Sequence, residues 1–161
     1  MGLWTELRHL LTNDILIVPG VAWLVAQLLK VLINGVVNKN FSAERLWGDG
    51  GMPSGHSATV VSLACMCGFF GDGGFAGTEF AIAAILAVIV MHDASGVRRE
   101  AGKQAMSIIS ITAVLDEYFA EKDKKIKTEK LKVLIGHTPL QVVAGAVLGF
   151  IVAMVAYLII S

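Results

Sequence analysis

Long apolar runs without charge are the feature that most limits what this chain can fold into. The clearest run, 139–160, has 22 residues and contains no Asp, Glu, Lys or Arg. A helix of this length, at about 1.5 Å of rise per residue, crosses the hydrocarbon core of a bilayer. Three more runs are mainly apolar: 15–37, which contains Lys30, 54–71, which is barely long enough, and 77–94, which contains Glu79 and Asp93. The pattern predicts an all-α integral membrane bundle of about four transmembrane helices in one domain, 1–161.

Composition excludes most soluble classes of protein. Hydrophobic residues make up 55% of the chain and charged residues 16%, with a mean hydropathy of +0.70. A disordered chain needs far more charge, and two cysteines, Cys65 and Cys67, are too few for a disulfide scaffold or a zinc cluster. The 13 cationic and 13 anionic side chains balance, so the net charge says nothing about nucleic acid and the distribution of charge matters more. We expect no nucleic-acid partner.

Two segments outside the spans have amphipathic patterns. Residues 1–13 place leucines and a tryptophan on one helical face, which is typical of a helix lying at the membrane interface. Residues 95–138 include an amphipathic stretch, 104–121, for which interfacial and bundle-packed positions are both open. A lysine-rich run, 122–132, follows and is suited to contact with anionic lipid.

The distribution of cations predicts the orientation. Four spans place loops 38–53 and 92–138 on one side, and these loops together with Lys30 hold 12 of the 13 Lys and Arg residues. Because short loops rich in Lys and Arg stay in the cytoplasm, we expect both loops there. The sequence thus predicts a multi-pass protein of the cell membrane, with its chemistry at the cytoplasmic face.

Two histidines lie beside predicted helix starts on this side. His56 follows Ser54 and Gly55 at the start of the second span, and His137 precedes Thr138 and Pro139 at the start of the fourth. Ser and Thr are preferred N-caps, and proline suits the first helical position. The free N–H groups of a helix start attract anions, and a glycine lets the backbone approach a bound oxyanion.

Cations at the same depth complete a predicted phosphate pocket. Lys30 and the pair Arg98 and Arg99 are placed to balance phosphate charge. One histidine can attack phosphorus while the second protonates the leaving oxygen, a scheme that requires no metal and no cofactor.

These motifs carry a family resemblance that covers roughly residue 26 to the C-terminus. The segments 50–58, Asp93-Ala-Ser-Gly-Val-Arg-Arg99 and Gly136-His-Thr-Pro-Leu-Gln-Val-Val-Ala-Gly145 resemble the small divergent bacterial branch of the type 2 phosphatidic acid phosphatase superfamily. That branch is related to acid phosphatases and vanadium-dependent haloperoxidases.

The resemblance implies a role for each matching residue. His137 corresponds to the nucleophile and His56 to the acid, while Ser54 and Gly55 correspond to contacts of the phosphate oxygens. Lys30 corresponds to the lysine of the first motif, and Arg98 or Arg99 to a clamping arginine.

The chain departs from the superfamily pattern at three places. Val37 and Asn38 replace the Arg-Pro of the first motif, and Arg45 is a possible substitute. Leu131 stands where the third motif has an arginine. Gln141 replaces the aspartate that orients the nucleophile, so either Gln141 or Asp93 is expected to serve.

The sequence therefore predicts a membrane lipid phosphatase. Its substrate would be a phosphate monoester or diphosphate of a lipid, hydrolysed through a phosphohistidine. The alternative is a non-hydrolytic lipid or anion carrier that keeps the same fold. The expected partners are the lipid phosphate substrate and anionic membrane lipid, and a homodimer stays open.

Overall fold

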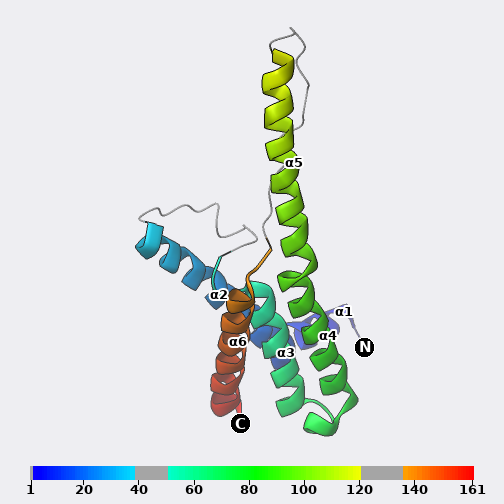
Figure 1. The fold of residues 1–161 in the computed structure, drawn as a ribbon. Helices are drawn as coiled ribbons and strands as arrows, with labels where there is room; N and C mark the ends of the chain where they lie inside the picture. The colour runs from blue at the N-terminus through cyan, green and yellow to red at the C-terminus, as the bar shows by residue number, and fades with distance from the viewer. Residues whose placement is uncertain (1, 39–50, 121–135) are drawn as a thin grey trace.

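The computed structural model describes residues 2–38, 51–120 and 136–161, and the elements within them are helical. Figure 1 shows a bundle of helices from which one long helix projects. In chain order the elements are α1 (Leu3–Leu11), α2 (Asp14–Asn38), α3 (Gly55–Phe70), a short 3-10 turn (Gly74–Ala76), α4 (Thr78–Ser95), α5 (Val97–Ala120) and α6 (Pro139–Ile160). The predicted all-α membrane bundle is confirmed.

Three helical stretches are long and apolar enough to cross a membrane. They are Asp14–Val36, Thr78–Leu115 and Pro139–Ile160, and the second of them joins α4 to most of α5. α3 is apolar but shorter, as expected from its barely sufficient length in the sequence. The chain thus has the elements of an integral membrane protein.

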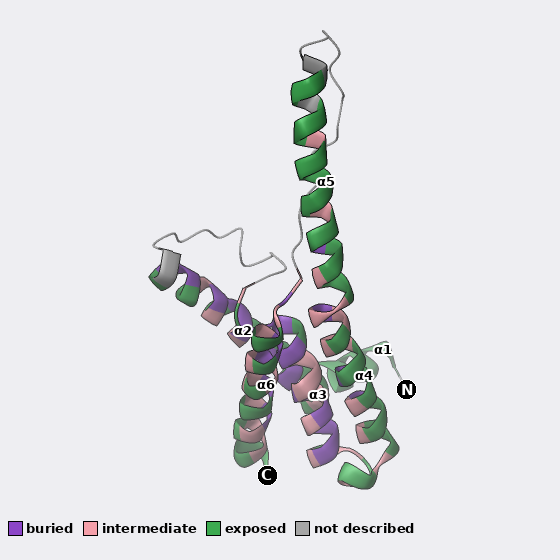
Figure 2. Cartoon of the chain, in the orientation of Figure 1, coloured by how far each residue is buried: buried purple, intermediate pink, exposed green. Residues whose placement is uncertain are grey.

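α3 is the centre of the bundle, because it packs against α2, α4 and α6. Its buried residues are mostly small, including Ala58, Ser62 and Ala64, and Figure 2 shows α3 as the most continuously buried helix. Small side chains let neighbouring backbones approach closely, which is how helices associate where lipid removes the hydrophobic driving force.

The α3–α6 contact depends on two glycines. A Cβ built on Gly145 would stand 2.3 Å from the carbonyl oxygen of Ser54, and one on Gly149 would stand 2.3 Å from that of Ala58. Neither distance can accommodate an alanine, so this glycine pair is a close-packing seam between α3 and α6. The seam fixes the first turn of α3 against α6.

α5 follows α4 after a break at Gly96 and projects away from the bundle (Figure 1). Many of its apolar side chains, among them Ile108, Ile111 and Leu115, are exposed (Figure 2). The helical character expected for 104–121 is therefore present, but this helix is not packed on the bundle. The lysine run 122–132 lies outside the described residues, as does most of loop 38–53.

Candidate active site

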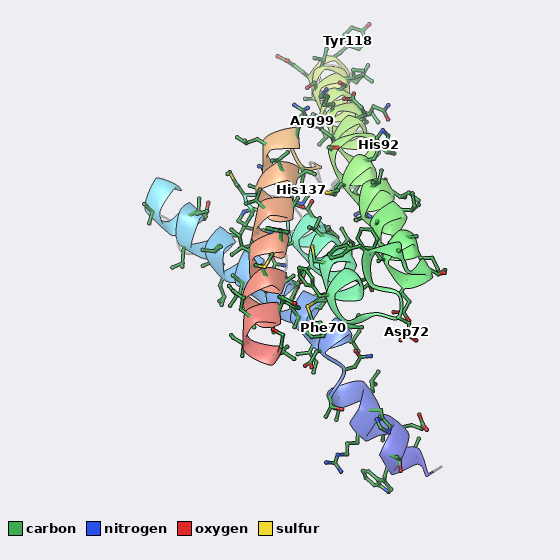
Figure 3. The ribbon with its side chains drawn as sticks, turned by 90° about the horizontal axis from the view of Figure 1, so that it is seen from below. Phe70, Asp72, His92, Arg99, Tyr118 and His137 are labelled. Atoms are coloured by element: carbon green, nitrogen blue, oxygen red, sulfur yellow. The ribbon has the colours of Figure 1, made fainter. Side chains whose placement is uncertain are left out.

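The starts of α3 and α6 meet the end of α4 at one end of the bundle. The backbone N–H of Ser54 donates to the carbonyl oxygen of Gln141 at 3.0 Å, and that of His137 donates to the carbonyl oxygen of Ala94 at 3.0 Å. Figure 3 shows His137 and Arg99 at this end and Phe70 and Asp72 at the other. Two short backbone links thus bring together segments that are far apart in sequence.

Ser54 caps α3, as the sequence predicts. Its hydroxyl accepts a hydrogen bond from the backbone N–H of Ser57 at 3.3 Å, and the Ser57 hydroxyl donates to it at 3.1 Å. Both serines are completely buried. An N-cap of this kind contributes about 1 kcal/mol and holds the first turn of the helix in register.

Thr138 caps α6, and Gln141 completes a capping box. The backbone N–H of Gln141 donates to the Thr138 hydroxyl at 3.4 Å, while the backbone N–H of Thr138 donates to Gln141 Oε1 at 3.0 Å. Pro139 occupies the first turn, as expected. The box identifies the side-chain oxygen of Gln141 as the atom that faces back toward His137.

His137 also contacts this oxygen. Its Nδ1 lies 3.3 Å from Gln141 Oε1, and the side chain is buried, with 4% of its surface exposed. Because an amide oxygen can only accept, Nδ1 must carry the proton in this contact. The neutral ring then has its free electron pair on Nε2, which is the state that a histidine nucleophile needs.

His56 lies next to His137 and is more open. The two ring centroids are 6.1 Å apart and the rings meet edge to face, while His56 itself is exposed. One buried and one exposed imidazole at this separation can act on the same small group from two sides.

α2 presents a buried polar face at the same end of the bundle. Gln27, Lys30 and Asn34 follow one another at helical spacing, and each is at least nine-tenths buried. Gly51 packs on the Lys30 stem, since a Cβ there would be 3.0 Å from Lys30 Cγ. Sequence reasoning singled out Lys30 alone, although the spacing of three polar residues within an apolar span was a readable signal.

Gln27 is distinctive because its Oε1 is buried and has no hydrogen-bond partner in the described part of the chain. The Gln27 side chain and the Trp23 ring both lie beside Gly55, where a Cβ would be 3.3 Å from Trp23 Cδ1. The absence of a side chain at Gly55 therefore makes room for Trp23. A contact of Gly55 with phosphate stays a prediction for its backbone.

The two arginines that follow α4 are positioned differently, Arg98 by its side chain and Arg99 by its backbone. Arg98 Nε donates to Asp93 Oδ2 at 2.7 Å, in an exposed ion pair. Arg99 has its backbone against Gly136, where a Cβ would be 2.4 Å from the Arg99 nitrogen. This contact brings the arginine pair next to His137, although the two segments are about 40 residues apart in sequence.

The structure brings together most of the predicted site residues. Of the two candidates for orienting His137, Gln141 contacts the ring and Asp93 pairs with Arg98. Arg45 lies outside the described residues. Among residues 2–38, 51–120 and 136–161, no group of three His, Cys, Asp or Glu side chains is arranged to hold a metal ion.

Comparison with known proteins identifies the family. A model of the family described as "Divergent PAP2 family" matches residues 11–152. The chain belongs to the divergent PAP2 family. The matched region includes α2, both histidine motifs and the arginine pair, so the whole candidate site falls within the family's shared part.

One relative in the divergent PAP2 family is similar along nearly its whole length. It is the uncharacterized membrane protein YuiD of Bacillus subtilis (strain 168), 38% identical over 153 residues, which cover 91% of this chain and 96% of the relative. No solved structure matches this chain. Family membership and the membrane character are thereby established.

Proposed function

We propose that this member of the divergent PAP2 family is a membrane lipid phosphatase. The observation that carries the proposal is the histidine pair: His137 and His56, with ring centroids 6.1 Å apart, lie at the capped starts of two helices. The neighbouring positive helix ends and the buried Lys30 favour an anion at this place.

The first step transfers the phosphoryl group to His137. Nε2 attacks phosphorus, an N–P bond forms, and the bond from phosphorus to the lipid oxygen breaks. His56 enters the step protonated and gives its proton to the departing oxygen. Gln141 holds the Nδ1 proton of His137, so that the attacking electron pair stays on Nε2.

The second step releases inorganic phosphate. His56, now neutral, accepts a proton from a water molecule whose oxygen attacks phosphorus. The N–P bond breaks and its electron pair returns to Nε2 of His137. Both histidines are then in the protonation states with which the cycle began, so one water is consumed for each phosphate released.

The phosphate oxygens would be held by Ser54, Gly55, Lys30 and the arginine pair. The Ser54 cap leaves the first N–H groups of α3 pointing out of the helix start, and Lys30 adds a full positive charge. We further propose that this end of the bundle faces the cytoplasm of the cell, because 12 of 13 cations belong to it or to the adjoining loops.

Phosphate release from purified protein tests the proposal. Phosphatidic acid, phosphatidylglycerophosphate and a prenyl diphosphate are supplied in detergent micelles, and inorganic phosphate is measured. We expect release from at least one lipid, and a fall to less than about a tenth of that rate in His137→Ala, since covalent catalysis is lost. His9→Ala, on exposed α1, is the matched control and should match wild type.

A carrier is the second candidate, and the observation that favours it is Gln141. An amide orients the ring but cannot balance the charge of an imidazolium, and the comparable Asp→Asn change in a serine protease costs about 10⁴ in rate. If none of the three lipids yields phosphate while phosphatidic acid still binds, the carrier interpretation replaces hydrolysis.

A further inference from the structure

A groove between α4 and α6, lined at one end by His92, Ser95 and Pro139, has a volume of about 490 Å³. Its walls are nearly all apolar. The residues that matter here are Val88, Met91 and His92 of α4, and Pro139, Val143 and Ala146 of α6. They recur at spacings of three and four, so each helix contributes one continuous face.

One end of the groove lies close to His137 along the chain, and the lining runs from there along the membrane-spanning part of α4 and α6. Pro139, at its upper end, is two residues from His137, and the His137 backbone N–H donates to Ala94 in the last turn of α4. From Pro139 the lining continues to Val147, which is roughly 12 Å along α6 at 1.5 Å per residue. This is somewhat over a third of a hydrocarbon core about 30 Å thick.

We propose that this groove binds one hydrocarbon chain of the lipid whose phosphate lies at His137. The inference rests on the proposed function and extends it to the apolar part of the substrate. A peptide or a soluble metabolite does not fit an apolar groove at membrane depth, where backbone polar groups would have no partners. A hydrocarbon chain has none to satisfy, and its head group then lies beside His92 and His137.

The groove favours the substrate over ordinary membrane lipid by positioning its phosphate, and not by binding its chain more tightly. Lipid tails are as apolar as the groove, so seating a chain there gains little from the hydrophobic effect. The gain is orientation: a chain fixed between α4 and α6 holds its own phosphate near Nε2 of His137. Chain length should therefore affect the rate of phosphate release, whereas a phosphate ester with short chains should not use the groove.

A bulky side chain in the groove tests this inference. Ala146 is the smallest residue of the lining, and Ala146→Trp fills the space. Val143→Trp is the second variant in case the first does not fold, since Val143 is 58% exposed. The matched control is Ala81→Trp, since Ala81 is exposed on α4 outside the groove. Activity is compared on dioleoyl and dibutyryl phosphatidic acid.

We expect the groove variants to lose about tenfold in kcat/KM on the dioleoyl lipid through misplacement of the phosphate, with little change on the dibutyryl ester. Ala81→Trp should leave both unchanged. An equal loss on both esters, or no loss on either, would overturn the groove assignment while leaving phosphatase activity in place.

A second readout does not depend on turnover. Phosphatidic acid with a diazirine in its acyl chain is photo-crosslinked in the cold, beside phosphatidylcholine with the same chain. We expect phosphatidic acid to label the peptides of α4 and α6 more strongly, and Ala146→Trp to remove the excess. Equal labelling by both lipids would show that the groove holds bulk membrane lipid only. This result would overturn the groove assignment even if hydrolysis had been demonstrated.

Discussion

Gln141 links several parts of the site. Its Oε1 faces both His137 Nδ1 and the Thr138 N–H, while its own backbone bonds Thr138 and Ser54. It therefore ties His137, the α6 cap and the α3 start into one unit. In the proposed mechanism the amide would keep the orienting role of an aspartate but not its charge.

Substitutions at Gln141 should separate orientation from charge. Gln141→Glu keeps the length and the acceptor and adds a charge that stabilises an imidazolium, so we expect a rate of phosphate release equal to or above wild type. Gln141→Leu removes the acceptor and should lower the rate by about tenfold or more, roughly 1.4 kcal/mol in barrier. Initial rates of phosphate release measure both.

Thr138→Ala is the matched control, because it removes the other half of the same capping box. Its cost to stability should be similar, about 1 kcal/mol, while the His137–Gln141 contact stays. If Gln141→Leu and Thr138→Ala reduce the rate equally, Gln141 acts only as a cap. Asp93→Asn is then the next substitution to measure.

Some of these residue roles could be read from sequence and others could not. Ser54, Thr138 and Pro139 are predictable because capping depends on local residue types. The Asp93–Arg98 pair depends on how α5 continues from α4 at Gly96, and the contact of Gly136 with Arg99 depends on where the start of α6 lies relative to α5. Local residue types determine neither. The polar face of Gln27 and Asn34 is readable from their helical spacing with Lys30.

At the scale of elements, the α3–α6 seam positions the two helix starts that carry the histidines. Gly145 lies against the Ser54 carbonyl oxygen, which itself accepts the backbone hydrogen bond from Ala58 at 3.1 Å. Any side chain at Gly145 therefore pushes on the first turn of α3. This contact therefore holds α3 against α6 and also positions the helix start that carries His56.

Gly145→Ala should destabilise the protein and reduce phosphate release together. Overpacking of this kind costs about 1–3 kcal/mol, and we expect a lower Tm in detergent. Gly20→Ala is the control, since no atom lies within 4 Å of a Cβ there and alanine favours a helix interior. A Gly145→Ala protein as stable and active as Gly20→Ala would show that α3 and α6 are not closely packed.

The elements themselves were largely predictable, but the placement of α5 was not. Apolar runs with few charges indicate helices at 14–38, 78–95 and 139–160 because a bilayer accepts little else. The amphipathic pattern after Gly96 predicts a helix but not its direction. That direction follows from the backbone conformation of Gly96. A glycine C-cap shows where α4 ends and leaves open the angle at which α5 continues.

At the scale of the whole molecule, charge separates the two ends of the bundle. Lys103 lies on α5 beyond the candidate site, while Asp72 lies in the turn at the opposite end, near Phe70 (Figure 3). In the proposed orientation, which rests on the cation distribution, the first end faces the cytoplasm. That orientation would decide which leaflet supplies the proposed substrate.

Cysteine labelling in intact cells tests the orientation. In a background where Cys65 and Cys67 are alanine, Lys103→Cys should react with an impermeant maleimide only after the membrane is opened. Asp72→Cys should react in intact cells, since both side chains are exposed and differ only in the side they face. The reverse pattern would place the candidate site outside the cytoplasm and contradict the cation count.

The most direct test of the central claim is the search for phosphate on His137. The His56→Ala protein is mixed with p-nitrophenyl phosphate, whose leaving group needs no proton, quenched in alkali, digested and analysed by mass spectrometry. Because His56 also activates water for the second step, we predict a phosphohistidine at position 137 that accumulates above the wild-type level and is absent from His137→Ala. Phosphate release by wild type with no phosphorylated His137 in either protein would contradict the account.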